Sequence, residues 1–349
     1  MGTAPPPPAR LAPVLATRDR VIRQVVGLRP FRRSGFNVSV ERASQALLIH
    51  NYGHGGGGIS LSWGTAVMAV EHALQTPHRT AAVIGAGVVG LSTARCLQAH
   101  GFRVQLYAAD LPPQTTSNVA GASWGPFSVF DPGVTPPGFD DGFRRAAKLA
   151  YEYFERLDGA RYGVSWKQNY SLADGRPEGF VVPSEEDRLV EGIRPDAEPV
   201  APGDHPFQVL SVTRRLTMLI EPPIYLSALL ADFRDAGGTV VIRRFAERHE
   251  LAVLGAPVVF NCTGLGARAL AGDEDVVPIK GQLVVLAPQP EVDYLTMGPG
   301  DLYMMPRADG IVLGGTHERD VWSLDPDPRE ADRILQGHHA LFGGSPSSR

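Results

Sequence analysis

The sequence predicts an α/β protein of two domains, one of them built on a parallel sheet of the Rossmann type. Two observations support this. The chain has 349 residues, more than a single hydrophobic core usually organises. A strand-like run at 80–84 is followed at once by Gly85-Ala86-Gly87-Val88-Val89-Gly90 and then by a helical pattern. That is the order of elements in a nucleotide-binding βαβ unit.

The composition is that of an ordinary globular protein. Hydrophobic residues make up 43% and charged residues 20%, which excludes disordered, collagen-like and coiled-coil chains. Cys96 and Cys262 are too few for a disulfide framework, no Cys/His cluster has zinc spacing, and we expect two buried thiols and no metal. The longest apolar run, at 81–91, is too short to span a bilayer, and no apolar leader is present, so we expect a cytoplasmic protein.

Positive charge gathers in the first part of the chain. Residues 1–78 hold eight arginines, no lysine and three acidic residues, a balance of +5, whereas the rest of the chain balances at -9. A basic arm of this kind could bind nucleic acid or anionic lipid. The arginines are scattered, however, and no aromatic stacking pattern accompanies them. We therefore expect no nucleic-acid and no membrane partner, and assign one or two of these arginines to a small anion.

The elements before the glycine motif follow from local patterns. Residues 1–17 begin with a proline-rich stretch and are expected to be disordered. A short helix at 19–26, strands at 27–32 and 36–41, and a buried strand at 47–51 come next. Glycines at five of the six positions 53–58 predict a loop, and the apolar period of 66–74 predicts a helix that ends before Pro77.

The segment 80–107 gives the strongest local signal. Its glycines allow a tight turn, a close approach of the backbone to a pyrophosphate and close packing of a helix on a strand. The helix at 91–100 offers free N–H groups and the positive end of its dipole to phosphates. The alternative is a glycine-rich turn without a ligand. An acidic residue after the next strand, 104–107, should hold the ribose, and Asp110 lies near that position.

The remaining chain alternates helices and strands and shows no internal repeat. Helical patterns occur at 145–157, 223–235 and 329–341, and strand patterns at 239–242, 258–261, 283–286 and 311–313. Residues 342–349 are mostly small or polar, and we expect a flexible tail there.

Three separated stretches together resemble the flavin-dependent D-amino-acid oxidase family. They are AVIGAGVVGL at 82–91 with TTSNVAG at 115–121, FNCTG at 260–264 followed by Gly281-Gln282, and IHNYGHGGGGI at 49–59 continuing to Trp63-Gly64. YMMP at 303–306 and Leu313-Gly314-Gly315 also fit. The resemblance covers about residues 18–340, and HNYGHGG is its most specific part.

The order of these stretches differs from that of the family. In the family the dinucleotide fingerprint opens the chain and HNYGHGG lies near its end, whereas here HNYGHGG comes first. The simplest interpretation is a circular permutation, with the family's C-terminal portion at 18–78 and its N-terminal portion beginning near Arg79. Permutation costs little stability where the old ends lie close together and the new ends fall in an exposed loop.

The resemblance implies two domains assembled from discontinuous stretches. An FAD-binding domain with a Rossmann-like parallel sheet should comprise 36–78, 79–124 and 222–272. A substrate domain with a mostly antiparallel sheet should comprise 18–35, 125–221 and 273–341. The implied cofactor is FAD, and the implied partners are a small amino-acid substrate and molecular oxygen. A homodimer is an open alternative.

The resemblance also implies the chemistry. A hydride passes from the substrate Cα to N5 of the flavin, the imino acid hydrolyses to a 2-oxo acid and ammonia, and oxygen reoxidises the flavin with release of hydrogen peroxide. The cofactor carries this chemistry while the protein orients the substrate. Three alternatives remain: an NAD-dependent dehydrogenase, an oxidase or dehydrogenase for another amine or an N-substituted amino acid, and a flavin-binding protein without oxidase activity.

Three residues carry the substrate-binding roles that the resemblance implies. Arg29 matches the arginine that clamps the substrate α-carboxylate, a role that suits the planar guanidinium fork. Tyr303 matches a tyrosine whose hydroxyl touches the same carboxylate, and the carbonyl of Gly56 matches the acceptor for the substrate amine. A surface arginine and a core aromatic are the alternatives for the first two. His54 and His317 are expected to be hydrogen-bonded in or beside the pocket rather than to act as bases.

The cofactor-binding residues that the resemblance implies come from five stretches of the chain. These are the glycine motif, the threonine-containing turn with the stretch after it, the strand end near the adenosine, the second glycine loop, and the ribose position. The residues are Gly85, Ala86, Gly87, Val88, Val89, Gly90, Asp110, Thr115, Thr116, Gly121, Ala122, Ser123, Trp124, Thr263, Gly264, Gly55, Gly57, Gly58, Ile59 and Ser60.

Several positions depart from the family pattern. Pro299 stands where the family has a second tyrosine, and Tyr294 is a candidate to replace it. Gly57 stands where a bulky residue is usual, which implies a roomier pocket. The family's ribose-binding acid aligns with Ala109, which leaves Asp110 as the candidate for that contact.

Overall fold

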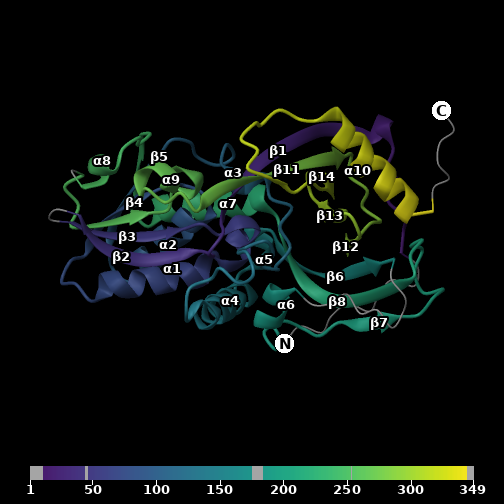
Figure 1. Cartoon of the computed structure of the whole chain (residues 1–349), viewed down its shortest axis with the longest axis horizontal. Coiled ribbons are helices and arrows are strands. Elements are labelled where there is room, and N and C mark those ends of the chain that lie inside the picture. The colour runs from purple at the N-terminus through teal and green to yellow at the C-terminus, as the bar shows by residue number, and fades with distance from the viewer. Residues whose placement is uncertain (1–10, 44–45, 175–183, 253, 344–349) are drawn as a thin grey trace.

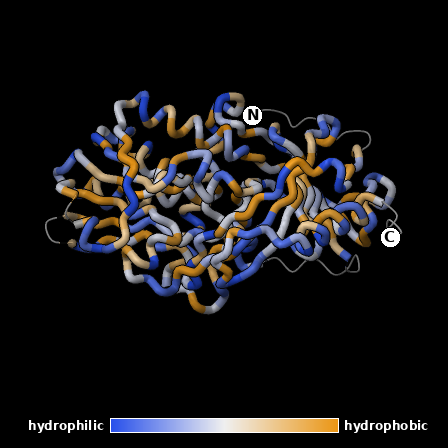
Figure 2. The backbone as a smooth tube through the Cα atoms, turned by 90° about the horizontal axis from the view of Figure 1, so that it is seen from above, coloured by the Kyte–Doolittle hydropathy of each residue, from blue (hydrophilic) through white to orange (hydrophobic). Residues whose placement is uncertain are grey.

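The computed structural model describes residues 11–43, 46–174, 184–252 and 254–343. Two sheets lie along the length of the molecule, a six-stranded sheet at one end and a nine-stranded sheet at the other (Figure 1). Segments of hydrophobic residues run through the body of both parts, whereas many of the outer loops consist of hydrophilic residues (Figure 2).

The six-stranded sheet has the order β2-β3-β10-β4-β5-β9. Its strands from β3 to β9 run parallel, and β2 pairs antiparallel with β3. Three of them lie where the sequence patterns predict them, at 80–84, 239–242 and 258–261. The strands are β2 (Asn37–Ala43), β3 (Ala46–Tyr52), β4 (Thr80–Ile84), β5 (Arg103–Ala108), β9 (Thr239–Ile242) and β10 (Val258–Asn261).

Helices cover both faces of this sheet. One face packs on α1 (Gly58–Leu74), α2 (Val88–Ala99) and α7 (Pro222–Asp235), and the other on α8 (Arg248–Ala252) and α9 (Ala267–Leu270). Side chains of β4 alternate between the two cores, as the two-residue period of a strand requires. A sheet covered on both faces explains the continuous apolar runs of its strands.

The nine-stranded sheet is mostly antiparallel and has the order β1-β11-β14-β13-β12-β6-β8-β7, with β15 beside β11. Among the ladders of its described strands, only β12 and β6 pair in parallel. The strands are β1 (Val21–Arg32), β6 (Val164–Ala173), β7 (Glu198–Val200), β8 (Ser211–Ile220), β11 (Val276–Leu286), β12 (Tyr294–Met297), β13 (Tyr303–Arg307), β14 (Gly310–Gly314) and β15 (Glu318–Arg319). α10 (Pro328–Leu341) packs on its outer face (Figure 1).

The remaining elements are short, apart from one helix. They are the 3-10 turns η1 (Arg18–Arg20), η2 (Gly55–Gly57) and η3 (Gly264–Gly266), the helices α3 (Thr116–Val119), α5 (Gly159–Tyr162) and α6 (Glu185–Leu189), and the long helix α4 (Phe139–Glu155). Within the described residues, no helix has both the length and the apolarity needed to cross a bilayer. Among these described residues, no group of three or more His, Cys, Asp or Glu side chains is arranged so that it could hold a metal ion.

Helix α4 corrects the predicted domain boundary at residue 125. It packs across α1 in the core of the six-stranded sheet instead of joining the substrate domain. The crossing is close because Gly64 has no side chain: a Cβ there would lie 1.9 Å from the carbonyl oxygen of Ala146. The FAD-binding part therefore extends over the first section of the stretch 125–221.

The start of the described chain also differs from expectation. Residues 11–17, predicted to be disordered, pack on the nine-stranded sheet with Leu11, Val14 and Ala16 buried. The helix predicted at 19–26 is wrong, because η1 gives way at once to β1, which pairs along its length with β11. At the other end Phe342 packs on Phe207 and is not part of a flexible tail. Residues 1–10 and 344–349 lie outside the described residues.

The α1–α4 crossing predicts opposite effects for two glycine-to-alanine substitutions. Gly64→Ala places a methyl group against the main chain of α4 and should lower the free energy of unfolding by about 2 kcal/mol. Gly142→Ala is the matched control on α4, because its Cβ meets only the end of Met68 at 3.8 Å. It should raise stability by about 0.5–1 kcal/mol. Thermal unfolding of both variants measures this, and a Gly64→Ala protein as stable as Gly142→Ala would contradict the close crossing.

Candidate active site

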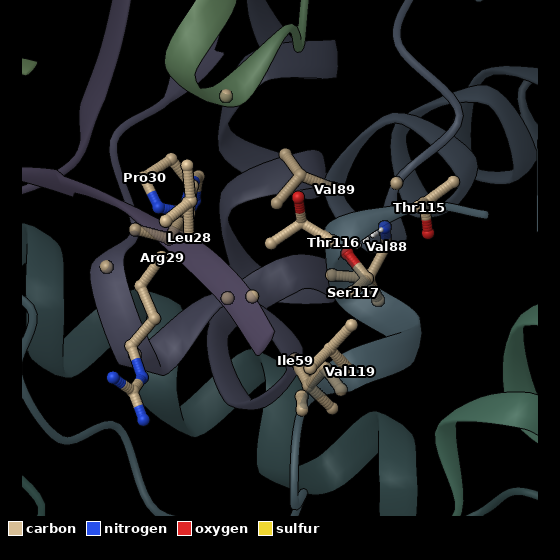
Figure 3. Close-up of a pocket in the computed structure, with 18 of the residues that line it drawn as sticks. Leu28, Arg29, Pro30, Ile59, Val88, Val89, Thr115, Thr116, Ser117 and Val119 are labelled. Atoms are coloured by element: carbon tan, nitrogen blue, oxygen red, sulfur yellow. Dashed lines mark hydrogen bonds between the residues drawn. The ribbon is translucent and has the colours of Figure 1, made fainter. Parts of the chain in front are cut away.

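A cavity of about 770 Å³ opens between the two sheets. Its walls come from loops at the carboxyl ends of β3, β4, β5 and β10 on one side and from β1, β11, β12 and β13 on the other. Figure 3 shows the arrangement: Val88, Val89 and the turn Thr115–Ser117 lie to one side, and the Arg29 side chain extends away from them. The complete lining also includes residues of the second half of the sequence, such as Tyr303 and Thr316.

The glycine motif forms a tight main-chain turn at the cavity wall. Gly85 has a φ of +111°, and a Cβ there would lie 2.3 Å from the carbonyl oxygen of Cys262. The N-cap residue of α2 is Gly87, which has no side chain to close the helix N-terminus. Instead Ser117 contacts the first turn, where its hydroxyl accepts from the Val88 N–H at 3.0 Å (Figure 3). Donors at a helix N-terminus suit an anion such as a pyrophosphate.

A second helix N-terminus, that of α1, reaches the same cavity. Gly58, Ile59 and Ser60 begin the helix and line the cavity wall. The preceding turn is held by main-chain hydrogen bonds, from Gly56 N–H to the Ser128 carbonyl and from Gly57 N–H to the His54 carbonyl, both at 2.9 Å. A Cβ at Gly55 would lie 2.1 Å from the Ser128 carbonyl oxygen, so this turn can form only from glycine.

Arg29 presents its guanidinium to the cavity from β1. Its Nη1 donates to the carbonyl of Thr316 at 3.1 Å, and no carboxylate of the described chain lies within ion-pair distance of it. The guanidinium rests against Gly281 of the neighbouring strand, where a Cβ would lie 2.6 Å from both terminal nitrogens. An arginine that is held by a carbonyl and has no acidic partner is available to a carboxylate ligand.

Tyr303 lines the same cavity from β13. Its ring lies flat over Gly314 and Gly315, where Cβ atoms would come within 2.0 Å of Cζ and 2.8 Å of Cε1 respectively. Met305 and Met297 add apolar surface beside it. The glycine pair therefore fixes the height at which the phenol stands above the sheet.

The two histidines of the site are held as neutral side chains. Burial lowers the pKa of His54 to about 3, and its Nε2 is hydrogen-bonded to the Thr65 hydroxyl at 2.9 Å. Burial lowers the pKa of His317 as well, and the nearby Arg29 guanidinium adds to that effect. His317 lies 3.4 Å from the Ser128 hydroxyl. These contacts match the expectation that both are hydrogen-bonded in or beside the pocket.

Two acidic residues line the described wall of the cavity, Asp110 and Asp301, and Asp110 is the one on the side of the six-stranded sheet. Asp110 lies after β5 and forms an ion pair with Arg244 at 3.5 Å, and both side chains are largely exposed. Ala109 beside it has no carboxylate. A diol bound here would meet Asp110 together with the two arginines Arg243 and Arg244.

Most of the residues expected at the site line the cavity. Those that do are Arg29, Tyr303, Gly56, Gly85, Ala86, Gly87, Val88, Val89, Asp110, Thr115, Thr116, Gly121, Ala122, Ser123, Thr263, Gly264, Gly55, Gly58, Ile59 and Ser60. Cys262 lines it too, and it is a buried free thiol, as is Cys96.

Three of the expected residues do not reach the cavity. Gly90 lies behind it, where α2 crosses Gly85 so closely that a Cβ would be 1.9 Å from the Gly85 carbonyl oxygen. Gly57 faces Val129 instead, and a Cβ at Gly57 would lie 2.6 Å from a methyl group of that valine. Trp124 is buried edge-on against Tyr151. All three support the site through packing.

Tyr294 does not replace the missing second tyrosine. It is buried on the face of the nine-stranded sheet away from the cavity, and its hydroxyl donates to the Ala12 carbonyl at 2.5 Å. The Tyr294 hydroxyl, which the sequence analysis considered for substrate binding, is thus hydrogen-bonded to the segment 11–17 instead.

Some lining residues have no sequence signal that would have identified them. Ser117 is adjacent to the expected threonines, but Phe127, Ser128, Thr316 and Arg243 come from loops without a motif. Their place depends on how the two sheets meet, which only the tertiary structure shows.

The cavity fits a flavin dinucleotide by the chemistry of its donors. Two helix N-termini supply N–H groups for a pyrophosphate and for an electron-rich ring, and Gly55, Gly85 and Gly121 contribute main chain to the wall. Small and apolar residues of both sheets contribute much of the remaining cavity wall. No geometry of the bound cofactor follows from this.

Comparisons with known proteins show which family the chain resembles. Residues 80–348 match the model of a family described as FAD dependent oxidoreductase. A D-amino-acid oxidase of Rubrobacter xylanophilus is 35% identical over 276 residues, 75% of this chain and 76% of that protein. The human D-aspartate oxidase is 32% identical over 263 residues, 74% of this chain and 75% of that protein. The glycine oxidase of Bacillus cereus has a similar fold, with a TM-score of 0.56 at 17% identity, over 76% of this chain and 78% of the other.

His54 predicts how stability depends on pH. Its pKa of about 3 in the folded state lies below the ordinary 6.5, so only the unfolded chain binds a proton as the pH falls through 6.5. This histidine therefore costs no stability above that pH, and near pH 5 it lowers the free energy of unfolding by about 2 kcal/mol. We expect His54→Gln to lose less stability than the wild type between pH 7 and pH 5 in urea denaturation.

The exposed His78 provides the control for that measurement. His78→Gln should keep the wild-type dependence on pH, because its side chain stands in solvent. If His54→Gln and the wild type lost equal stability over this range, the neutral buried state of His54 would be refuted.

Proposed function

This chain belongs to the family of FAD-dependent oxidoreductases, and on that premise we propose that it deaminates a D-amino acid by oxidation. The observation that carries the proposal is the guanidinium of Arg29, free of any carboxylate in the described chain, at the wall of a cavity that also receives the N-terminus of α2. A carboxylate-binding arginine and a phosphate-binding helix in one cavity suit a small amino acid beside a dinucleotide. The activities for which the relatives are named support the D configuration.

The residues that would hold FAD belong mainly to the six-stranded sheet. The turn at Gly85–Val89 with Ser117 suits the pyrophosphate, Asp110 the adenosine ribose, and the start of α1 the pyrimidine end of the ring. When bound, FAD supplies the acceptor for the hydride released from the substrate Cα.

The chain's own residues bind and orient the substrate. Arg29 donates two N–H groups to the α-carboxylate while the Thr316 carbonyl holds its Nη1. The Tyr303 hydroxyl donates to the same carboxylate, and the Gly56 carbonyl accepts from the amine. Three fixed contacts around the Cα define one face of the substrate, and fixed orientation can contribute roughly 7–11 kcal/mol to lowering a barrier.

The overall reaction balances with oxygen as the terminal acceptor. An amino acid, oxygen and water give a 2-oxo acid, ammonia and hydrogen peroxide. Neither His54 nor His317 is needed as a base at the Cα in this scheme, because the substrate reacts as the neutral amine and the hydrogen on Cα leaves with its electron pair as a hydride rather than as a proton. Their lowered pKa values are in keeping with neutral roles.

A second candidate is an oxidase for another amine or for an N-substituted amino acid. The observation that favours it is the loss of a tyrosine at Pro299, which Tyr294 does not replace. Peroxide release on a panel of D-, L- and N-methyl amino acids separates the two candidates. A flavin-loaded protein that releases no peroxide with any member of the panel would overturn both.

Arg29 provides the direct test of the substrate site. Arg29→Ala should lower kcat/KM for the best D-amino acid by about 100- to 1,000-fold, because two charge-assisted hydrogen bonds to the carboxylate are lost. The visible flavin absorption should be unchanged, since the phosphate-binding turn lies elsewhere in the cavity. Steady-state peroxide kinetics per bound flavin measure the effect.

Arg23→Ala is the control on the same strand. Arg23 is exposed on β1 and pairs with Asp309 at the surface, so its removal should change kcat/KM by less than about twofold. Normal turnover by Arg29→Ala would contradict the carboxylate clamp.

We also propose that the chain is a circular permutant of its family. The family model begins to match at residue 80, the first residue of β4, although the segment before it carries HNYGHGG. That segment is no separate unit: it contributes β1 to one sheet and β2, β3 and α1 to the other. The exposed ion pair of Arg18 with Asp332 brings the start of this segment next to α10, which suits a former connection there.

Restoring the family order tests the permutation. A chain that starts at Pro77, continues from Gly343 through a glycine/serine linker of about 15 residues into Leu11, and ends at Thr76 should bind FAD and keep kcat/KM within about threefold, because every strand pairing is retained. The same joined chain opened between Val89 and Gly90, inside α2, should not fold. Failure of the first chain to bind flavin would count against the proposal.

A further inference from the structure

Helix α10 lies directly behind the tyrosine of the site. Its apolar residues, among them Ile334 and Leu335, pack on one face of the nine-stranded sheet with Met304 and Leu313. Tyr303 and Met305 project from the opposite face into the cavity. Gly337 lets the helix approach closely, because a Cβ there would lie 2.5 Å from a methyl group of Leu302. The helix thus contacts the back of the strands whose front carries Tyr303.

One buried histidine of α10 reaches through to those strands. His338 has no exposed surface, and its Nε2 donates to the carbonyl oxygen of Gly314 at 3.0 Å. Burial lowers the pKa of His338 to about 4, and the hydrogen bond to the Gly314 carbonyl opposes that shift only in part. The imidazole is therefore neutral near pH 7 and keeps its N–H on Nε2 for this bond. Its Nδ1 has no partner among the described residues.

The acceptor of that bond lies under the tyrosine ring. Gly314 pairs with Tyr303 across the β13–β14 ladder, and the ring lies over the Gly314–Gly315 peptide. A shift of the Gly314 main chain would therefore move the surface on which the phenol rests. His338 fixes the same residue from the other side of the sheet.

A second donor of α10 fixes the loops on either side of the ring. Arg333 donates from Nη2 to the Gly315 carbonyl at 2.6 Å and from Nη1 to the Gly300 carbonyl at 3.0 Å. Both loops continue into the cavity wall, through Asp301 on one side and Thr316 on the other. Thr316 in turn accepts from Arg29. One helix thus braces both substrate-binding side chains through main-chain carbonyls.

We propose that His338, with Arg333, is a positioning residue that sets the location of the Tyr303 hydroxyl for carboxylate binding. It contacts neither substrate nor cofactor and acts through Gly314 and the ring above it. The inference rests on the proposed function only in that Tyr303 is taken to contact a carboxylate ligand.

A double-mutant cycle on the flavin-loaded protein tests whether the contacts of His338 and Arg333 to the main chain, here called the brace, position Tyr303. The probe is propionate, an unreactive carboxylate without an amine, and its Kd is read from the change in visible flavin absorption. His338→Leu keeps the apolar volume but removes the donor, and should raise this Kd by about tenfold. His338→Gln retains an N–H donor and should stay within about threefold of the wild type. In a Tyr303→Phe background His338→Leu should change the Kd by less than about twofold.

The other outcomes overturn the proposal. A purely structural role would lower the thermal stability of His338→Leu and leave its propionate Kd at the wild-type value. Equal effects of His338→Leu with and without the Tyr303 hydroxyl would show that the histidine does not act through it. Gln336→Ala, on the exposed side of the same helix, should leave the Kd unchanged. Should His338→Leu not fold, Arg333→Met takes its place in the same cycle.

The cycle and the proposed function fail in different ways. Peroxide release by the wild type on D-amino acids tests the function, whereas the propionate titration needs no turnover. A wild type that binds propionate but oxidises no D-amino acid would refute the proposed function and leave the brace open to the cycle. A wild type that binds no carboxylate would refute both.

Discussion

The site depends on one short strand. β10 has only four residues, Val258–Asn261, all of them buried, and it pairs in parallel with β3 on one side and β4 on the other. Because parallel strands end at the same edge, the loops after β3, β4 and β10 converge there, and all three line the cavity. This pairing joins the HNYGHGG segment to the glycine motif, although 25 or more residues separate the two along the chain. Strand pairing of this kind is independent of the order in which the strands are linked.

The positive groups around the cavity do not depend on a histidine. They include the N-termini of α1 and α2 and the guanidinium of Arg29, and burial keeps His54 neutral. Arg29 would be costly if it stayed unpaired in a dry site, because an uncompensated charge loses its hydration on burial. A carboxylate ligand removes that cost by supplying a counter-charge. The Thr316 carbonyl partly satisfies the guanidinium but leaves its charge uncompensated.

Sequence patterns predicted the elements whose conformation is determined by neighbouring residues in the chain. The strand at 80–84, the glycine turn and the helix after it follow from periodicity and backbone freedom, and the structure confirms them. The helix expected at 19–26 is wrong because β1 gains a full ladder with β11, and such long-range pairing overrides helical propensity. The segment 11–17 looked disordered from its prolines, yet Leu11 and Val14 fill the core under α10. No local pattern reports that a distant sheet has room for two more apolar side chains.

The same distinction applies to the glycines of the site, because backbone conformation requires glycine at one position and neighbouring side chains occupy the Cβ position at others. Gly85 combines a left-handed φ with close main-chain packing, so its sequence signature is strong. Gly281 and Gly314 have no such φ, and an alanine there would be conformationally allowed. A Cβ would instead displace the side chain lying over each of them, the Arg29 guanidinium over Gly281 and the Tyr303 ring over Gly314. These two glycines therefore leave space for the Arg29 and Tyr303 side chains to lie flat against the sheet. A single sequence does not show this reason, because a glycine needed for space looks the same as a glycine needed for a turn.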